Sequence, residues 1–500
     1  MRRSNLVFAA ATVLAAVAAA GGTAAAAGGA FTTTVKPYLK PTGNDYSFKP
    51  LLSVADKVPL TGDSSKRYQM VGIPDGLGAR ELRNDGAELF MNHELVNTAL
   101  SEPVVGGPLN RGAFVSRYHL SKDAKVRSGK RAYDTVYKEN DFFAPAPDST
   151  NTTPGFGRFC SGELFGTREG LDRPIYFTGE EGGGASTFDG KGGQSVAVFG
   201  NRVHTLPKMG RFPKENTIVA RKTGNRTVAF PMEDGPTTPD SQLWMYVGEK
   251  HRRGTPLARN GLDNGKLYVF VIDGAADEGT FTGGTKLGRW VEIPGAEGKS
   301  EAELEAAADA VGAFGFIRVE DAASGNPGEL YFVTTGGNAT KNLLGRAYRL
   351  KFDPRDPTDV GTLKVIYNAD QIVAAGGDTA VSPDNIDVSN RYLMIQEDGT
   401  AESRPVMGSR GRDGSIWRFD LKNGFTRRRV AQLNPPGRDG VPVGPGVWES
   451  SGIIDTSSMY GKDSWLTDVQ AHPPTAAPAP NTVEDGQLLL MRPKRMGHHR

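Results

Sequence analysis

Residues 175–181 read IYFTGEE, a short run of strand-forming residues that ends in two carboxylates. The same order, an apolar segment and then a polar cluster, occurs in six places: 89–94 (LFMNHE), 175–181, 228–234 (VAFPMED), 330–337 (LYFVTTGG), 392–398 (YLMIQED) and 465–472 (WLTDVQAH). Acidic residues also begin ordinary turns, and the spacing between the six is unequal. A sixfold repetition nevertheless favours similar sheets arranged around one centre.

Most other apolar segments beyond residue 30 are also short and rich in Val, Ile, Tyr and Phe, as strands are. Examples are 88–91, 174–177, 243–247, 266–272, 329–333, 346–352, 392–395 and 415–419. The 64 Gly and 32 Pro fit the turns between them. We therefore predict an all-β fold that resembles a six-bladed β-propeller. One short helix is expected near 300–313, where Ser300 and Glu303 form a capping-box pattern.

The first 30 residues have the layout of an export signal: Arg2 and Arg3, then an apolar run, then small residues. The paired arginines are typical of twin-arginine signals but also occur in general secretory ones, and a membrane anchor is the alternative. We expect a signal peptide at 1–30, a single domain at 31–491 and a solvated basic tail at 492–500. No later stretch is long and apolar enough for a transmembrane segment. The mature chain is thus expected to be secreted, periplasmic or held in the cell envelope.

Composition excludes several classes of site. The formal net charge is +2, which argues against a nucleic-acid partner. A lone cysteine, Cys160, cannot form a disulfide within the chain or a multi-cysteine zinc site. With only 7 His, a multi-histidine metal site is not expected, so carboxylates would have to bind any metal. The sequence also lacks a G-x-S-x-G elbow, a P-loop and an H-E-x-x-H motif.

The strand-end carboxylates are the candidate ligands. They are Glu94, Glu180, Glu181, Glu233, Asp234, Glu397 and Asp398, and the segment 382–387 adds Asp384 and Asn385. Brought together, such groups would repel one another unless a hard cation such as calcium bound them. Cys160 would suit iron or another transition metal beside carboxylates. The alternative interpretation of Cys160 is a small buried apolar residue.

A set of motifs in order along the chain resembles the PhoX family of secreted alkaline phosphatases. The motifs are NHE (92–94), RFCSG (158–162), GEE (179–181), GRF (210–212) with Glu215, MEDG (232–235), RVED (318–321), SPDN (382–385), QEDG (396–399), WESSGIID (448–455) and DVQAH (468–472). The resemblance spans roughly residues 40–490. It implies a six-bladed propeller exported by the twin-arginine route, with an iron (Fe3+) and calcium cluster that hydrolyses phosphate monoesters.

The resemblance also implies roles for individual residues. Cys160 matches a cysteine that bridges the irons, and Arg318 matches an arginine that holds the substrate phosphate. Six further residues match positions where the family has metal ligands: Glu94, Glu180, Glu215, Glu320, Asp384 and Asn385. The predicted metal set consists of these six, Cys160, and the strand-end residues Glu181, Asp234 and Glu397. Three departures point to a side branch of the family: Ser161-Gly162-Glu163 after the cysteine, Val319 before Glu320, and Lys214 before Glu215.

The first interpretation of the function is a secreted metal-dependent phosphomonoesterase that needs no serine nucleophile. A calcium-dependent propeller hydrolase, resembling a phytase or a lactonase, is the second. The third is a non-catalytic binding propeller in which calcium is only structural. Metal content separates them, because only the first requires iron. Expected partners are small phosphate esters and the twin-arginine or general secretory export machinery.

Overall fold

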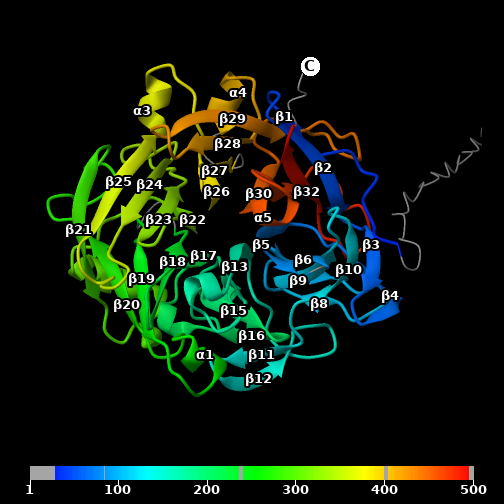
Figure 1. Ribbon diagram of the computed structural model, residues 1–500, viewed down its shortest axis with the longest axis horizontal. Helices are drawn as coiled ribbons and strands as arrows, with labels where there is room; N and C mark the ends of the chain where they lie inside the picture. Colours follow the sequence, from blue (N-terminus) through cyan, green and yellow to red (C-terminus); the bar gives the residue numbers. More distant parts are fainter. Residues whose placement is uncertain (1–28, 84, 236–239, 399–403, 495–500) are drawn as a thin grey trace, which may run out of the picture.

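The computed structural model describes residues 29–83, 85–235, 240–398 and 404–494. The predicted signal peptide falls almost wholly outside the described residues, as does most of the basic tail. The described chain is mainly β, with its sheets arranged in a propeller-like ring (Figure 1). No helix in this part of the chain is both long and apolar enough to cross a membrane.

Each sheet is mainly an antiparallel meander that runs outward from the centre, and each of the first two sheets also contains one parallel pairing on its outer side. The first contains β3 (Lys57–Leu60), β4 (Asp63–Gln69), β5 (Pro74–Leu82), β6 (Gly86–His93), β9 (Phe114–Leu120) and β10 (Val126–Arg131). The next contains β11 (Thr135–Lys138), β12 (Asp141–Pro145), β13 (Phe159–Phe165), β14 (Ile175–Glu180), β15 (Ser195–Phe199) and β16 (Arg202–Thr205). A small sheet pairs β7 (Leu100–Ser101) with β8 (Asn110–Arg111).

A nine-stranded sheet follows, in which two meanders join at their outer strands β21 and β25. One meander is β17 (Lys214–Val219), β18 (Arg226–Glu233), β19 (Trp244–Glu249), β20 (Lys266–Val271) and β21 (Thr285–Glu292). The other is β22 (Val319–Ser324), β23 (Glu329–Thr334), β24 (Arg346–Lys351) and β25 (Gly361–Asn368). All the pairings within this sheet are antiparallel.

The last two sheets close the ring with strands from the N-terminal region. Strand β1 (Leu39–Pro41) pairs with β29 in the sheet of β26 (Pro383–Val388), β27 (Tyr392–Glu397), β28 (Ser415–Asp420) and β29 (Thr426–Leu433). Strand β2 (Tyr46–Ser53) pairs with β32 in the sheet of β30 (Glu449–Asp455), β31 (Trp465–Ala471) and β32 (Asp485–Pro493). The two ends of the described chain are thereby held in the same part of the molecule.

The innermost strands form a closed ring around the central axis. In order, β5 contacts β13, β13 contacts β17, β17 contacts β22, β22 contacts β26, β26 contacts β30, and β30 returns to β5. Their labels surround the centre of Figure 1. Residues at the starts of these inner strands therefore converge on one region. The six repeated segments singled out in the sequence are instead the second strands of their sheets, β6, β14, β18, β23, β27 and β31, whose ends pair with the starts of the inner strands.

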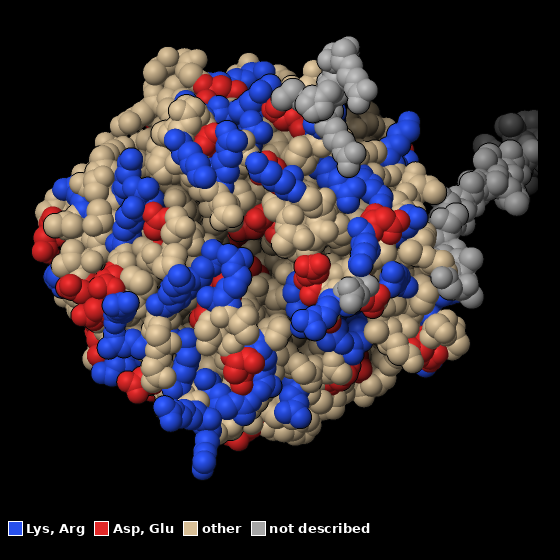
Figure 2. Space-filling view, in the orientation of Figure 1, with Lys and Arg blue, Asp and Glu red and all other residues tan. Residues whose placement is uncertain are grey.

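The hydrophobic core lies between neighbouring sheets. The Phe90 and Tyr176 rings, from β6 and β14, stack with centroids 5.2 Å apart. Within one sheet, the Phe332 and Tyr348 rings face each other across β23 and β24 and stack at 5.0 Å. Large aromatic side chains such as Trp244, Trp448 and Trp465 are fully buried. Over the face drawn in Figure 2, Lys and Arg side chains are spread widely with Asp and Glu among them.

The predicted strand segments all lie in or overlap strands of the structure, and the predicted helix is α2 (Glu301–Ala310). Ser300 caps α2, and Glu303 completes the capping box. The expectation of one helix is too low even for the described residues. Four further short helices are present: α1 (Pro256–Arg259), α3 (Ala369–Ala374), α4 (Arg404–Ser409) and α5 (Ser457–Tyr460). Segments of this length are too short to show a helical period, which explains why the sequence did not reveal them.

Candidate metal centre

The six inner strands begin in the same way. The second residue of each strand lies at the mouth of the channel. In five of the six strands, this residue has a carboxylate or a thiol side chain. These second residues are Asp75, Cys160, Glu215, Glu320, Asp384 and Ser450. Acidic and soft ligand atoms are thus supplied from five directions around one axis.

A break in the strand ladder aims these side chains at the channel. The pairing register shifts between Phe159 and Gly162 in β13, and between Val319 and Ala322 in β22. Comparable shifts occur at the starts of β5, β17, β26 and β30. A β-bulge of this kind bends the strand and redirects its side chains. The residue before the strand is also left-handed at Arg158 (φ 43°) and Arg318 (φ 59°).

Among the described residues, three overlapping groups of side chains have the geometry to hold metal ions. They are Asp75–Glu94–Cys160, Cys160–Glu181–Glu215 and Glu215–Glu320–Asp384, and within each group the ligand atoms lie within 4.8 Å of one another. Cys160 and Glu215 each belong to two groups, so the three form one continuous chain across the channel. The site is therefore suited to several metal ions rather than one.

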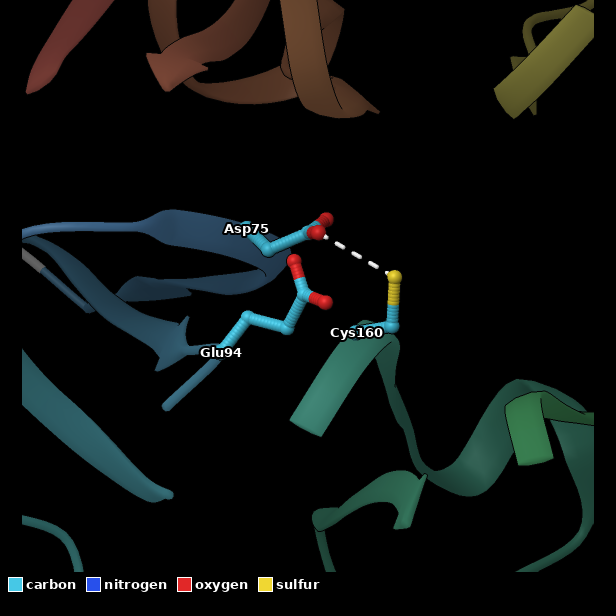
Figure 3. A group of neighbouring side chains, drawn as sticks. All are labelled: Asp75, Glu94 and Cys160. Carbon is cyan, nitrogen blue, oxygen red and sulfur yellow. Dashed lines mark hydrogen bonds between the residues drawn. The ribbon is translucent and has the colours of Figure 1, made fainter. Parts of the chain in front are cut away.

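Figure 3 shows the first group, in which Asp75 and Glu94 point toward the thiol of Cys160. The Cys160 thiol donates to Asp75 Oδ2 across 3.3 Å. Gln470 Nε2 donates to the same oxygen of Asp75 and to Glu94 Oε2, both at 3.0 Å. Asn385 Nδ2 donates to the other oxygen, Asp75 Oδ1, across 3.2 Å. Neutral amide donors thus hold the carboxylates in place around the sulfur.

The electrostatics of the cluster are unfavourable in the absence of a cation. Burial, followed by repulsion from Asp75, raises the pKa of Cys160 well above its ordinary value. Burial and the neighbouring Glu320 raise the pKa of Glu215 and of Asp384 in the same way. A bound cation reverses this effect, because it favours the ionised form of each ligand.

Buried oxygens without a hydrogen-bond donor show that the residues fit such cations. Neither carboxylate oxygen of Glu215 has a hydrogen-bond partner among the described residues, and the side chain is fully buried. The same holds for Asp384 Oδ1 and Asn385 Oδ1. Leaving such groups unsatisfied is costly. An all-oxygen group next to a thiol-containing group matches a hard cation beside a transition metal.

Two arginines lie over the carboxylates. Arg158 Nη2 contacts Glu94 Oε1 at 2.7 Å and Glu181 Oε2 at 2.8 Å. Arg318 Nε contacts Asp234 Oδ1 at 3.0 Å, and its Nη2 contacts Glu320 Oε1 at 2.9 Å. The Arg158 side chain is 45% exposed and that of Arg318 is 19% exposed. Both guanidinium groups therefore border the ligand cluster and partly reach solvent.

Of the predicted metal set, Glu94, Cys160, Glu181, Glu215, Glu320 and Asp384 lie in the three groups, and Asn385 contacts Asp75. Glu180 and Glu397 lie elsewhere, whereas Asp234 borders the groups, because Arg318 bridges it to Glu320. Glu180 accepts from the backbone N–H groups of Gly157 and Phe188. Glu397 pairs with Arg412 at 2.6 Å. Asp234 accepts from Arg318 through both of its carboxylate oxygens.

The structure brings two further residues into the site: Asp75, which sequence reasoning did not single out, and Arg158, which it quoted within the motif RFCSG without a role. Asp75 lies in the segment Pro74-Asp75-Gly76, which has the composition of a turn. Its position in the strand could have identified Asp75 as a candidate ligand. It is the second residue of an inner strand, as Asp384 is in Pro383-Asp384-Asn385. Arg158 corresponds in the same way to Arg318, one residue before the strand.

Comparison with known proteins places this geometry in context. The sequence profile of the PhoX alkaline phosphatase family matches residues 201–436. Among solved structures, Pseudomonas fluorescens PhoX in complex with vanadate, a transition state analogue, matches with a TM-score of 0.63 and 16% identity, over 93% of this chain and 97% of that one. A search of curated proteins finds no match.

Two further solved structures match this chain with TM-scores below 0.5. One is RAG in complex with one melted and one unmelted RSS (TM-score 0.40, 11% identity, 89% of this chain and 99% of that one). The other is luciferin-regenerating enzyme (TM-score 0.34, 8% identity, 84% and 92%). The profile match and the fold shared with PhoX confirm that this chain resembles the PhoX family of alkaline phosphatases.

Proposed function

We propose that this chain is a metal-dependent phosphomonoesterase whose centre lies at one mouth of a six-bladed propeller channel. The match to the PhoX alkaline phosphatase family supports a phosphatase. The observation that carries the proposal is the ring of second residues on the inner strands, which brings four carboxylates and a thiol to one axis. The closed ring of β5, β13, β17, β22, β26 and β30 supports six blades, the nine-stranded sheet counting as two.

The donor sets favour two kinds of metal. Cys160 with Asp75 and Glu94, and Cys160 with Glu181 and Glu215, combine sulfur with oxygen, which suits iron. Glu215, Glu320 and Asp384 offer oxygen alone, which suits calcium. When bound, these ions would supply Lewis-acid stabilisation of the charge on the transferring phosphoryl group.

The residues of this chain would position the phosphate around that centre. Arg318 and Arg158 present N–H donors at the edge of the cluster, where a guanidinium can contact two phosphate oxygens at once. In the structure these donors are engaged by Asp234, Glu320, Glu94 and Glu181. We expect the phosphate to take over part of these contacts. Donors fixed in advance at a site of developing charge stabilise the transition state.

Two alternatives remain, a calcium-dependent hydrolase and a calcium-stabilised binding propeller. Both require only calcium, which the all-oxygen group fits, whereas the proposed phosphomonoesterase also requires iron. The deciding experiment is elemental analysis of protein purified from its native export route, combined with hydrolysis of a generic phosphate ester before and after chelation. We expect iron and calcium, with activity lost on chelation. Calcium without iron would favour the other two interpretations.

The variant Cys160→Ala tests the role of the thiol directly. We expect it to lose iron and phosphatase activity while keeping calcium, because the all-oxygen group contains no sulfur. The matched control is Ser450→Ala, the equivalent position on β30, which lies outside the three ligand groups. Full activity in Cys160→Ala would contradict the proposal.

We also propose that the chain acts outside the cytoplasm, following export through the signal at residues 1–30. The paired arginines favour the twin-arginine route, which carries folded proteins. Replacing Arg2 and Arg3 by lysine should stop export by that route and leave the full-length chain in the cytoplasm. Unchanged export would indicate the general secretory route.

A further inference from the structure

The ring of ligand groups is interrupted on one side. The second residue of β30 is Ser450, whereas the second residue of each of the other five inner strands supplies a carboxylate or a thiol. On β31 the residue after the strand is His472, where β6 and β14 are followed by Glu94 and Glu181. The sector of β30 and β31 therefore contributes least to the metal centre. A substrate that reaches the metals has most room on this side.

A cavity of about 590 Å3 occupies that sector, between the sheet of β6 and the sheet of β31. Glu94 and Arg158 line it and also belong to or border the candidate metal centre, so cavity and centre are continuous. Much of the remaining wall is apolar: Ile73, Leu95, Val96, Val447, Pro473 and Val483. Its volume is in the range of small-molecule sites, which combine apolar walls with a few polar groups.

The charges around the cavity disfavour an anion. Its carboxylates are Glu94, Glu449 and Glu484. Its positively charged side chains are Arg158 and His472. The imidazole of His472 contacts two of the carboxylates: Nδ1 lies 2.8 Å from Glu484 Oε2, and Nε2 lies 3.7 Å from Glu449 Oε2. Three negative groups thus face two positive ones that are already paired. A second anionic group on a ligand would be repelled here.

We propose that this cavity binds the alcohol part of the substrate, and that the preferred substrates are phosphate monoesters of uncharged, largely apolar alcohols. The phosphate would lie at the metal centre beside Arg158, and the alcohol would extend along the apolar wall. This inference rests on the proposed phosphatase function.

Ethyl phosphate and hexyl phosphate test it, because both release a primary alcohol and differ only in apolar length. For the metal-loaded enzyme we expect kcat/KM to be about tenfold higher for hexyl phosphate, as four additional CH2 groups are partly buried. The variant Val96→Asp places a charge on the wall at a side chain that is 55% exposed, so folding should not suffer. It should bring the ratio close to one by lowering the value for hexyl phosphate alone.

The matched control is Val360→Asp, at a similarly exposed valine (49%) outside the cavity, which should keep the wild-type ratio. Binding of ethylphosphonate and hexylphosphonate, measured by calorimetry, gives a readout independent of turnover and should show the same preference and the same loss in Val96→Asp. Turnover of both esters with equal kcat/KM, or an unchanged ratio in Val96→Asp, overturns the cavity assignment alone. No turnover of either ester overturns the phosphatase function and the assignment with it.

Discussion

Glu180 and Glu181 are neighbours in the chain, and both are buried, yet they face different environments. Glu180, the last residue of β14, accepts from two backbone N–H groups and ties the loops at Gly157 and Phe188 to the sheet. Glu181, one residue later, faces Arg158, Cys160 and Glu215. A period of two along the strand separates the two roles. Burial and charge alone therefore do not identify a metal ligand.

The same division recurs around the ring. Glu233 and Glu397 also end their strands, and each accepts from the indole N–H of a buried tryptophan, Trp244 and Trp417 respectively. At the starts of the inner strands, both carboxylate oxygens of Glu215 and one of Asp384 lack any such donor among the described residues. Glu180, Glu233 and Glu397 thus accept hydrogen bonds from donors of the protein itself, whereas a bound cation would satisfy Glu215 and Asp384. The following variants test this distinction, beginning with the largest effect.

The largest effect is expected from Glu215→Gln, which should abolish metal binding by the ligand groups at the starts of the inner strands. Glu215 belongs to two ligand groups, so its loss affects both metal sites, and we expect phosphatase kcat/KM to fall by more than about 100-fold. The rise in melting temperature on adding calcium should also be lost, since that stabilisation comes from binding to the native state. After chelation the variant should melt no lower than the chelated wild type, because an uncharged amide replaces a repelled carboxylate. If the chelated variant were clearly less stable than the chelated wild type, Glu215 would be a carboxylate that stabilises the fold, like Glu397, and not a metal ligand.

Glu397→Gln should instead affect the fold. Arg412, with a side chain only 4% exposed, would lose its main charged partner and keep the Thr379 carbonyl at 3.2 Å and the exposed Asp378 at 3.4 Å. We expect the free energy of unfolding to fall by about 3 kcal/mol, measured by denaturant titration, because an unpaired buried charge is costly. Metal content should stay at the wild-type level. The double variant Glu397→Gln/Arg412→Met should recover much of the loss, and a failure to recover would point to the Trp417 contact instead.

His472 occupies the position after β31 and tests the sector that lacks metal ligands. Its hydrogen bonds and charge interactions with Glu449 and Glu484 outweigh burial and raise its pKa from 6.5 to about 10. The folded state thus binds the proton more tightly, so this stabilisation is complete below pH 6.5 and is lost as the pH rises through 10. His472→Gln should be less stable than the wild type by about 2 kcal/mol at pH 6, after allowance for partial exposure.

That difference should shrink toward zero above pH 10, as followed by denaturant unfolding at several pH values. His119→Gln is the control, because its partner Asp85 is an exposed surface residue. We expect less than about 0.5 kcal/mol for this variant. A pH-independent difference for His472→Gln would mean that the imidazole contributes by packing alone.

The sequence predicted the strands and the polar ends of β6, β14, β18 and β27 because both depend on local composition. It could not separate Glu397 from the metal set, because its partner Arg412 comes from the loop between α4 and β28. It missed Asp75, which looks like part of a turn until six strand starts are superposed. Register and bulges decide which side chain faces the channel, and they depend on long-range pairing rather than on the residues themselves.

The smallest effect is expected from Glu180→Gln. The amide keeps the oxygen that accepts from the N–H groups of Gly157 and Phe188, so the loops remain attached, and we expect a change in unfolding free energy below about 1 kcal/mol. Metal content and kcat/KM should stay at wild-type values. The same substitution one residue later, Glu181→Gln, should lower both, because it removes a charged ligand from the Cys160 group. The other oxygen of Glu180, Oε2, has no hydrogen-bond partner among the described residues. If Glu180→Gln reduced metal content as much as Glu181→Gln does, this oxygen would be a metal ligand as well, and the distinction between the two adjacent carboxylates would fail.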